Sequence, residues 1–354
     1  MASQQILFSP AELAYLHRSL SLTPPIRPDG RTPTQFRPLT AETGILPGTN
    51  GSARVHFADG TEAIVGVKAE IEKTVEGSTV IAEEQERARN EGGDAGGKSS
   101  RGDWIELAVE IPGQRDDEAS TVFLAEMLRE ALLADKEFAK KLFINRRFHW
   151  RLYLDVLLIS PPLSYPLPLL SLTTHLALLA TRLPRLKSEA DEDPMFDDDW
   201  EASTFLYPRE GAVDGGPRPP VTLLVVTVGD NVIFDPAKEE LAVAESALAV
   251  SVAESRRVRD AGAMDVDSKA RELRLLSIRT IDPPSRLTPP GVPHTSNTGP
   301  AKQTQDDAQG TETVWKAPLG GTKFGVLDGI IQAVLENGGI ADEVLDGLEG
   351  VELS

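Results

Sequence analysis

The chain has 354 residues, a length that fits two or three domains or one large domain with insertions. Its 36 basic and 55 acidic residues give a net charge of −19, whereas a bare nucleic-acid-binding protein is usually basic. Any RNA contact must therefore come from a local basic patch or from partner proteins. The absence of cysteine excludes disulfides, cysteine-ligated zinc and thiol catalysis.

The hydropathy pattern gives no sign of a membrane partner. No apolar run reaches the roughly 18 residues that span a bilayer. The first residues lack the charged and apolar regions of a signal peptide. We therefore expect an intracellular protein.

The first ordered block holds a helix and a hairpin. A Ser-Pro-Ala-Glu start at residues 9–12 supplies an N-cap, a proline at the first helical position and a glutamate at the third, and predicts a helix to about Leu20. Two β-like runs, 51–57 and 61–71, are separated by an Ala-Asp-Gly turn. An Asp-Gly pair between β-branched stretches predicts a β-hairpin.

The next block alternates strand, helix, strand and helix. A strand at 104–113 leads into a helix whose apolar positions, at helical spacing, are Val122, Leu124, Ala125, Leu128 and Leu132. A strand follows that alternates strictly, with one face formed by Phe148, Trp150, Leu152, Leu154, Val156 and Leu158. Residues 167–182 read as a buried helix that ends near Pro184.

The last block repeats strands and a helix. A hairpin is predicted for 221–235, further strands for 247–255 and 272–281, and a closing helix for 325–348. Runs of strands between single helices favour an α+β fold over a doubly wound parallel sheet. We expect one domain over residues 1–354, with flexible polar inserts at 72–103, 189–218, 253–270 and 283–312.

The sequence carries no established catalytic or cofactor motif. Its five histidines form no i, i+4 pair, and neither a GxSxG elbow nor a Walker A or GxGxxG loop is present. We therefore predict no metal site and no cofactor.

Arginine-rich stretches are the remaining candidates for a site. The Arg27-Pro28-Asp29-Gly30-Arg31 segment reads either as a tight turn closed by an arginine–carboxylate pair, which we favour, or as an arginine pair aimed at phosphate. Arg115 stands beside a helix start, where it could reach a phosphate. A second basic group consists of Arg146, Arg147 and Arg151, which a solvated strand end explains equally well.

Five segments occur in one order and at suitable spacing, namely 27–31, 51–71, 111–118, 150–160 and 227–240. Together they resemble the RNase PH-like ring subunits of the eukaryotic RNA exosome. The resemblance implies an α+β, RNase PH-like fold of the ribosomal protein S5 domain 2-like type, with two sheet-and-helix repeats. It also implies a hexameric ring of heterodimers with other RNase PH-like subunits, S1 and KH cap proteins, an associated 3′-to-5′ nuclease, and RNA. Nuclear, nucleolar and cytoplasmic locations follow from it.

The same resemblance implies that catalysis is lost. Active members place two catalytic aspartates where this chain has Leu241 and Ala247, while Asp235 and Glu240 are kept. Their Gly-Gly-Thr-Arg phosphate turn falls on Pro161, Pro162 and Ser164, and proline has no N–H to offer an anion. We expect Asp235 and Glu239 to cap the turn into the next helix instead.

The functional expectation is a non-catalytic subunit that lends arginines to the RNA channel. The RNA-binding candidates are Arg115 and Arg151, with Arg147 behind them, and the structural residues of the family pattern are Arg27, Asp29, Gly30, Arg31, Asp155 and Asp235. The alternative is an active, phosphate-dependent 3′-to-5′ exoribonuclease. A third possibility is an unrelated acidic scaffold protein.

Overall fold

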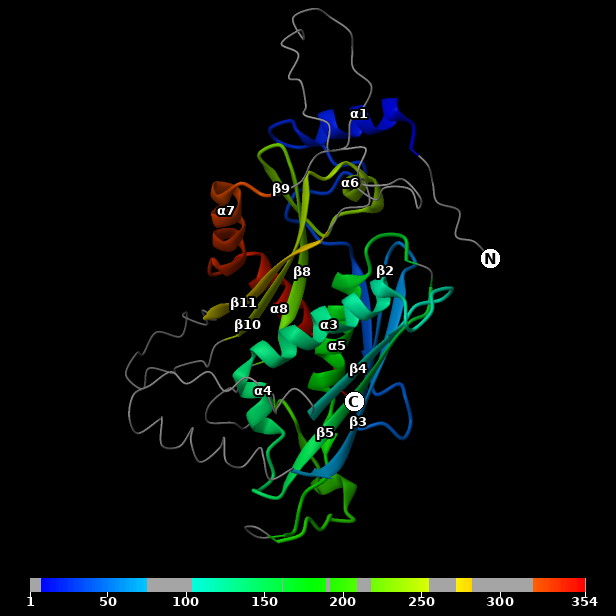
Figure 1. Ribbon diagram of the computed structural model, residues 1–354, viewed down its shortest axis with the longest axis vertical. Coiled ribbons are helices and arrows are strands. Elements are labelled where there is room, and N and C mark those ends of the chain that lie inside the picture. Colours follow the sequence, from blue (N-terminus) through cyan, green and yellow to red (C-terminus); the bar gives the residue numbers. More distant parts are fainter. Residues whose placement is uncertain are drawn as a thin grey trace, which may run out of the picture.

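The computed structural model describes residues 8–74, 104–160, 162–188, 192–208, 218–254, 272–281 and 321–353. Within these residues two β-sheets stack face to face, with helices between them and further helices outside the second sheet (Figure 1). This is the α+β arrangement of two sheet-and-helix repeats that the sequence predicts. None of the described helices is long and apolar enough to cross a membrane.

The first sheet has five strands in the order β1-β2-β3-β5-β4. Its neighbours are antiparallel except for β4 and β5, which run parallel. The predicted hairpin is confirmed as β2 and β3, and Gly60 takes the positive φ of +89° that the turn requires. The strand bounds are β1 Leu39–Thr43, β2 Gly51–Phe57, β3 Glu62–Lys73, β4 Ile105–Glu110 and β5 Phe148–Leu158.

The second sheet has four antiparallel strands in the order β11-β10-β8-β9. Every residue of β8 and β10 is buried, which is the pattern of strands covered on both faces. Their bounds are β8 Val221–Val228, β9 Asn231–Phe234, β10 Ser246–Glu254 and β11 Leu273–Ile281.

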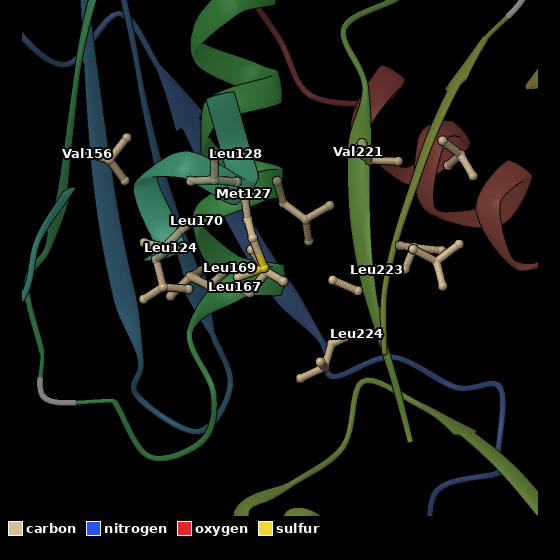
Figure 2. Close-up of a cluster of buried hydrophobic side chains, with 14 of the residues drawn as sticks. Leu124, Met127, Leu128, Val156, Leu167, Leu169, Leu170, Val221, Leu223 and Leu224 are labelled. Carbon is tan, nitrogen blue, oxygen red and sulfur yellow. The ribbon is translucent and has the colours of Figure 1, made fainter. Parts of the chain in front are cut away.

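Helices α3 (Ala119–Ala134) and α5 (Leu167–Leu179) fill the space between the two sheets. All residues of α5 are buried, because it contacts both sheets and has no outward face. Figure 2 shows leucines of both helices between the strand that carries Val156 and the strand that carries Leu223. One predicted core position of α3 is wrong: Val122 is exposed, and the buried face runs instead through Leu124, Met127, Leu128, Ala131 and Leu132.

The closing helix of the prediction is two helices, α7 (Phe324–Leu335) and α8 (Ile340–Glu349), which lie outside the second sheet (Figure 1). The break falls at Gly338 and Gly339. Gly338 has a positive φ of +69°, and a Cβ on Gly339 would come within 2.7 Å of the Glu336 carbonyl oxygen. A continuous helix over 325–348 is therefore wrong.

The N-terminal helix follows its sequence signal. Helix α1 (Pro10–Leu20) begins with the capping box that the sequence predicts, in which the Ser9 amide donates to the Glu12 carboxylate at 2.7 Å and the Glu12 amide donates to the Ser9 hydroxyl at 3.3 Å. It packs on α6 (Lys238–Val243) at one end of the molecule (Figure 1).

At the opposite end lies a structure that we call the acidic hairpin, residues 182–187 and 192–205 (Figure 1). Strands β6 (Arg182–Leu183) and β7 (Thr204–Phe205) pair at its base, and the short 3-10 helix η3 (Trp200–Ala202) precedes β7. The following residues Leu206 and Tyr207 are buried in the core beside α4 (Lys136–Lys141). The described part of the expected 189–218 insert therefore packs on the domain, which the sequence did not predict.

The other expected inserts fall largely outside the described residues. Two of their boundaries differ from the prediction. Glu72 and Lys73, expected in the 72–103 insert, are the last residues of β3. Ala253 and Glu254, which the predicted strand 247–255 and the predicted insert 253–270 shared, belong to the strand β10.

Candidate functional site

The Arg27–Arg31 segment is a turn whose first arginine is completely buried. The Gly30 amide donates to the Arg27 carbonyl at 3.1 Å, with Gly30 at φ +77°. The Arg27 guanidinium makes a two-pronged ion pair with Glu240 at 2.7 and 2.8 Å, and both side chains have no exposed surface. Its remaining N–H groups donate to backbone carbonyls, among them that of Phe234 at 3.2 Å. Arg27 is thus fully engaged with the second half of the chain.

Asp235 is the second anchor, held by Arg31 and Arg37. Arg31 donates to its carboxylate at 3.0 Å, and Arg37 donates at 2.6 Å through its guanidinium and at 2.8 Å through its backbone amide. The Asp235 side chain is completely buried, and its φ of +46° places it in the left-handed region that aspartate tolerates better than most residues. We call these five side chains, Arg27, Arg31, Arg37, Asp235 and Glu240, the arginine junction.

The arginine junction corrects the expected helix cap. The Glu240 carboxylate, not that of Glu239, accepts the Ala237 amide at 2.7 Å at the start of α6. Asp235 binds arginines instead of capping the helix. Asp235 and Glu240 therefore both lie buried against arginine.

Arg37 also connects the junction to the segment after β5. Its guanidinium donates to the Ser164 hydroxyl at 3.0 Å and to the Asp59 carboxylate at 2.7 Å. Burial alone would lower the pKa of Arg37, but its hydrogen bonds and charge interactions with Asp235 and Asp59 raise it overall. Burial would raise the pKa of Asp59, and hydrogen bonds from Thr61 together with the charge of Arg37 lower it overall. Both groups therefore stay charged and paired.

The structure thus brings together the two segments that were expected, from the family resemblance, to correspond to a lost active site. The Arg37 guanidinium donates hydrogen bonds to both the Ser164 hydroxyl and the Asp235 carboxylate. Pro162 is half-buried in the same segment, whereas Pro161 lies outside the described residues. Arg37 and Asp59 were missed as site residues in the sequence. Asp59 was read only as a hairpin-turn residue, and no local pattern marks Arg37.

Leu241 and Ala247 are both buried hydrocarbon. Leu241 lies in α6 with 4% of its surface exposed, and Ala247 is the second residue of β10 with none exposed. Ala247 is paired on both sides, with Val226 of β8 and Ile281 of β11. Across the described residues, no three histidine or acidic side chains gather in a way that could hold a metal ion.

The three candidate RNA-binding arginines do not form one patch. Strands β4 and β5 are parallel, with Ile105 beside Leu152 and Glu110 beside Leu157. Arg115 follows the far end of β4, whereas Arg147 and Arg151 lie at the near end of β5, on the order of 20 Å away at about 3.3 Å per residue. Sequence spacing could not separate them, because it does not contain the strand register.

The surroundings of these arginines differ as well. The Arg115 side chain is 83% exposed and contacts only its neighbour Asp117 among the described residues, at 2.7 Å. Arg151 bridges Glu72 and Glu106 at 2.9 and 3.0 Å, and these hydrogen bonds raise its pKa. Arg147 lies 2.9 Å from Asp193 of the acidic hairpin. Arg115 is therefore the most accessible of the three.

Strand β5, which contains Arg151, carries two further polar residues, Asp155 and His149. Asp155 is exposed on β5, between Gly66 of β3 and Ala108 of β4. His149, two residues before Arg151, is buried in a stack on Trp104 with ring centroids 4.4 Å apart. Burial lowers the pKa of His149, and the charge of Arg151 lowers it further against the opposing effect of Glu72.

Comparison with known proteins gives a consistent set of relatives. Residues 35–184 match the 3′ exoribonuclease family, domain 1. The chain is 32% identical over 249 residues to the exosome complex component RRP42 of Saccharomyces cerevisiae, covering 69% of this chain and 80% of the relative. It is 33% identical over 258 residues to exosome complex component rrp42 of Schizosaccharomyces pombe, covering 68% and 77%. Among solved structures, an archaeal exosome core aligns over 77% of this chain and 85% of its own, at 18% identity and a TM-score of 0.49.

Proposed function

The chain belongs to the RRP42 family of exosome complex components, and from this premise we propose that it is a non-catalytic ring subunit of the RNA exosome. In this role it builds part of the ring with other RNase PH-like subunits, beneath S1 and KH cap proteins. It guides RNA toward an associated 3′-to-5′ nuclease in RNA processing and degradation, including ribosomal RNA maturation. Its expected locations are those of the complex, in the nucleus, nucleolus and cytoplasm.

The non-catalytic assignment rests on one observation: the guanidinium of Arg37 is already bound by other side chains of this protein. Phosphorolysis needs free positive groups for two phosphates and carboxylates for a metal ion or a proton. Here the guanidinium nearest the former phosphate turn binds Asp235, Asp59 and the Ser164 hydroxyl. The residues that the family resemblance aligns with the two catalytic aspartates, Leu241 and Ala247, are buried hydrocarbon.

The RNA contacts are proposed in the order expected from the sequence, with Arg115 now set ahead of Arg151. Arg115 comes first, because its guanidinium is exposed and pairs, among the described residues, with Asp117, a surface residue two positions along the chain. Arg151 comes second, since RNA would have to displace two carboxylates from it. Arg147 comes last, because phosphate approaching it would also approach the acidic hairpin.

The catalytic part of the proposal is tested by phosphorolysis. The purified chain is incubated with phosphate, magnesium and oligo-RNA, beside an active RNase PH as a positive control. We expect no nucleoside diphosphate above the no-protein blank. Steady release that scales with the concentration of the chain would identify it as an active phosphate-dependent exoribonuclease and reject the proposal.

The assembly and RNA parts are tested on the intact complex. Affinity purification should recover five related ring proteins and three cap proteins, and recovery of the chain by itself would contradict the ring role. RNA cross-linked to the complex should attach to the peptide that carries Arg115, and Arg115→Ala should reduce that adduct. An adduct pattern unchanged by Arg115→Ala would remove this residue from the RNA path without affecting the family assignment.

A further inference from the structure

The acidic hairpin exposes three large apolar side chains within a short stretch of chain. Met195 is 67% exposed, Phe196 49% and Trp200 48%. Five residues of chain limit the separation of Met195 and Trp200 to about 18 Å. Single exposed apolar residues are ordinary on protein surfaces, but a group of them in one place is typical of a binding surface.

These apolar side chains are surrounded by negative charge. Residues 192–201 contain no lysine or arginine, and their acids are Glu192, Asp193, Asp197, Asp198, Asp199 and Glu201. Arg147 pairs with Asp193 and Lys187 pairs with Asp197 at 3.0 Å. Asp198 and Glu201 are exposed and make no ion pair within the described part of the chain. The 192–201 arm therefore combines exposed apolar side chains with unpaired acids, whereas the basic residues Arg182, Arg185 and Lys187 lie on the other arm.

The hairpin holds its shape without a ligand. The Phe196 ring packs on Trp150 of β5 with centroids 6.2 Å apart, and backbone amides of the two arms, those of Lys187 and Asp197, donate across the hairpin at 2.8 Å. A hydrogen bond from Lys187 lowers the pKa of Asp197 and keeps it charged. The Asp199 carboxylate caps η3 by accepting the Glu201 amide at 3.0 Å. A partner would thus meet a preformed surface, which reduces the ordering cost of binding.

We propose that the acidic hairpin binds a lysine- or arginine-rich segment of a protein partner, whose apolar side chains pack on Met195 and Trp200. The charge of the surface selects this occupant, because RNA and anionic membranes carry phosphate that the acids repel. The basic side chains of the partner pair with Asp198 and Glu201, and the apolar contacts supply the anchor. This binding surface goes beyond the ring role and does not depend on it.

The test uses the full-length chain and a fluorescein-labelled peptide of alternating lysine and leucine, followed by fluorescence anisotropy. One double variant, Met195→Ser with Trp200→Ser, removes the apolar contacts, and a second, Asp198→Asn with Glu201→Gln, removes two charges. The matched control, Asp116→Asn with Glu118→Gln, makes the same change of net charge at exposed positions beyond the opposite end of the first sheet. Circular dichroism and thermal unfolding check that each variant is folded.

We expect each hairpin variant to weaken peptide binding by about tenfold, the effect of losing about 1.4 kcal/mol. The control should retain the wild-type affinity within about twofold, and a peptide of alternating glutamate and leucine should not bind. Equal weakening by the control would show attraction to net charge alone and overturn the proposal. Unchanged affinity in the serine variant would also overturn the proposal.

Discussion

Two groups of arginines in this molecule have opposite surroundings. In the arginine junction, the side chains of Arg27, Arg31 and Arg37 are 0%, 9% and 10% exposed, and they bind acids that arrive from more than 190 positions later in the chain. On the first sheet and its ends, Arg115, Arg147 and Arg151 are 83%, 55% and 29% exposed. The number of arginines in a segment therefore does not locate an RNA-binding surface. The arginines of the junction are buried and paired with acids, and they hold the two halves of the fold together.

The energetic consequences of the two environments differ for a physical reason. A buried ion pair has already lost its water, so removing one partner leaves a charge with no compensation. An exposed pair retains water and is screened by salt, so either partner can be lost cheaply. Substitutions in the two groups should therefore separate clearly in unfolding experiments.

The largest effect is expected at Glu240. Glu240→Ala leaves the fully buried Arg27 guanidinium without its carboxylate, which should lower the free energy of unfolding by about 3–5 kcal/mol. Urea denaturation measures this change. Glu239→Ala, at the adjacent half-buried position, is the matched control and should change stability by less than about 0.5 kcal/mol. Equal losses of stability at Glu240 and Glu239 would show that the buried ion pair with Arg27 contributes no more to stability than a half-buried surface acid.

A smaller loss is expected at Asp235. Asp235→Asn preserves the shape and the tolerance for positive φ, but removes the charge that Arg31 and Arg37 share. Since both arginines keep some exposed surface, we expect a loss of about 2–3 kcal/mol in the same denaturation experiment. A change below about 0.5 kcal/mol would show that Arg31 and Arg37 find water or other partners without cost.

The first sheet should show a stability that depends on pH through His149. Because the folded-state pKa of His149 is lowered, the unfolded chain binds more protons as the pH falls below about 6.5, and stability should decline in that range. His149→Phe keeps an aromatic ring on Trp104 and should flatten this decline between about pH 7 and 5. Unfolding curves across that range test it. His56→Gln serves as the control, and a decline that survives in His149→Phe would assign it elsewhere.

The smallest effects belong to the exposed arginines. Arg151→Ala should cost about 0.2–1 kcal/mol, reduced further at high salt, because its two carboxylate partners stay hydrated. Arg115→Ala should change stability by less than about 0.5 kcal/mol. Denaturation at low and high salt compares the two. A loss at Arg115 as large as that at Glu240 would mean that it is structural and not available to RNA.

The sequence predicted most of the fold because its signals were local. The capping box at Ser9 and Glu12, the turn at Gly60 and the alternation from Phe148 to Leu158 each depend on neighbouring residues alone. The split between α7 and α8 was also visible as Gly338-Gly339, but the apolar periodicity on both sides masked it. Val122 was misplaced because a one-residue shift of a helical face is within the tolerance of periodicity.

The site was less predictable because its contacts are not local. The acids at Asp235 and Glu240 were marked, yet their partners Arg27, Arg31 and Arg37 come from a segment about 200 residues earlier. Only the fold shows that Glu240 caps α6 while Glu239 does not. Likewise, the polar composition of residues 189–218 predicted a flexible insert, whereas Phe196 and the buried Leu206 and Tyr207 pack the hairpin against the domain.

Helix α5 is shielded from water along its whole circumference, because the first sheet packs against one side of it and the second sheet against the other. A fragment that stops at Pro184 would present a leucine-lined helix and one uncovered layer to the solvent, even though it retains the whole first sheet. Such a piece should self-associate instead of folding alone, so the two repeats form a single cooperative unit in spite of their similar plans. Duplicated architecture here does not give separable halves.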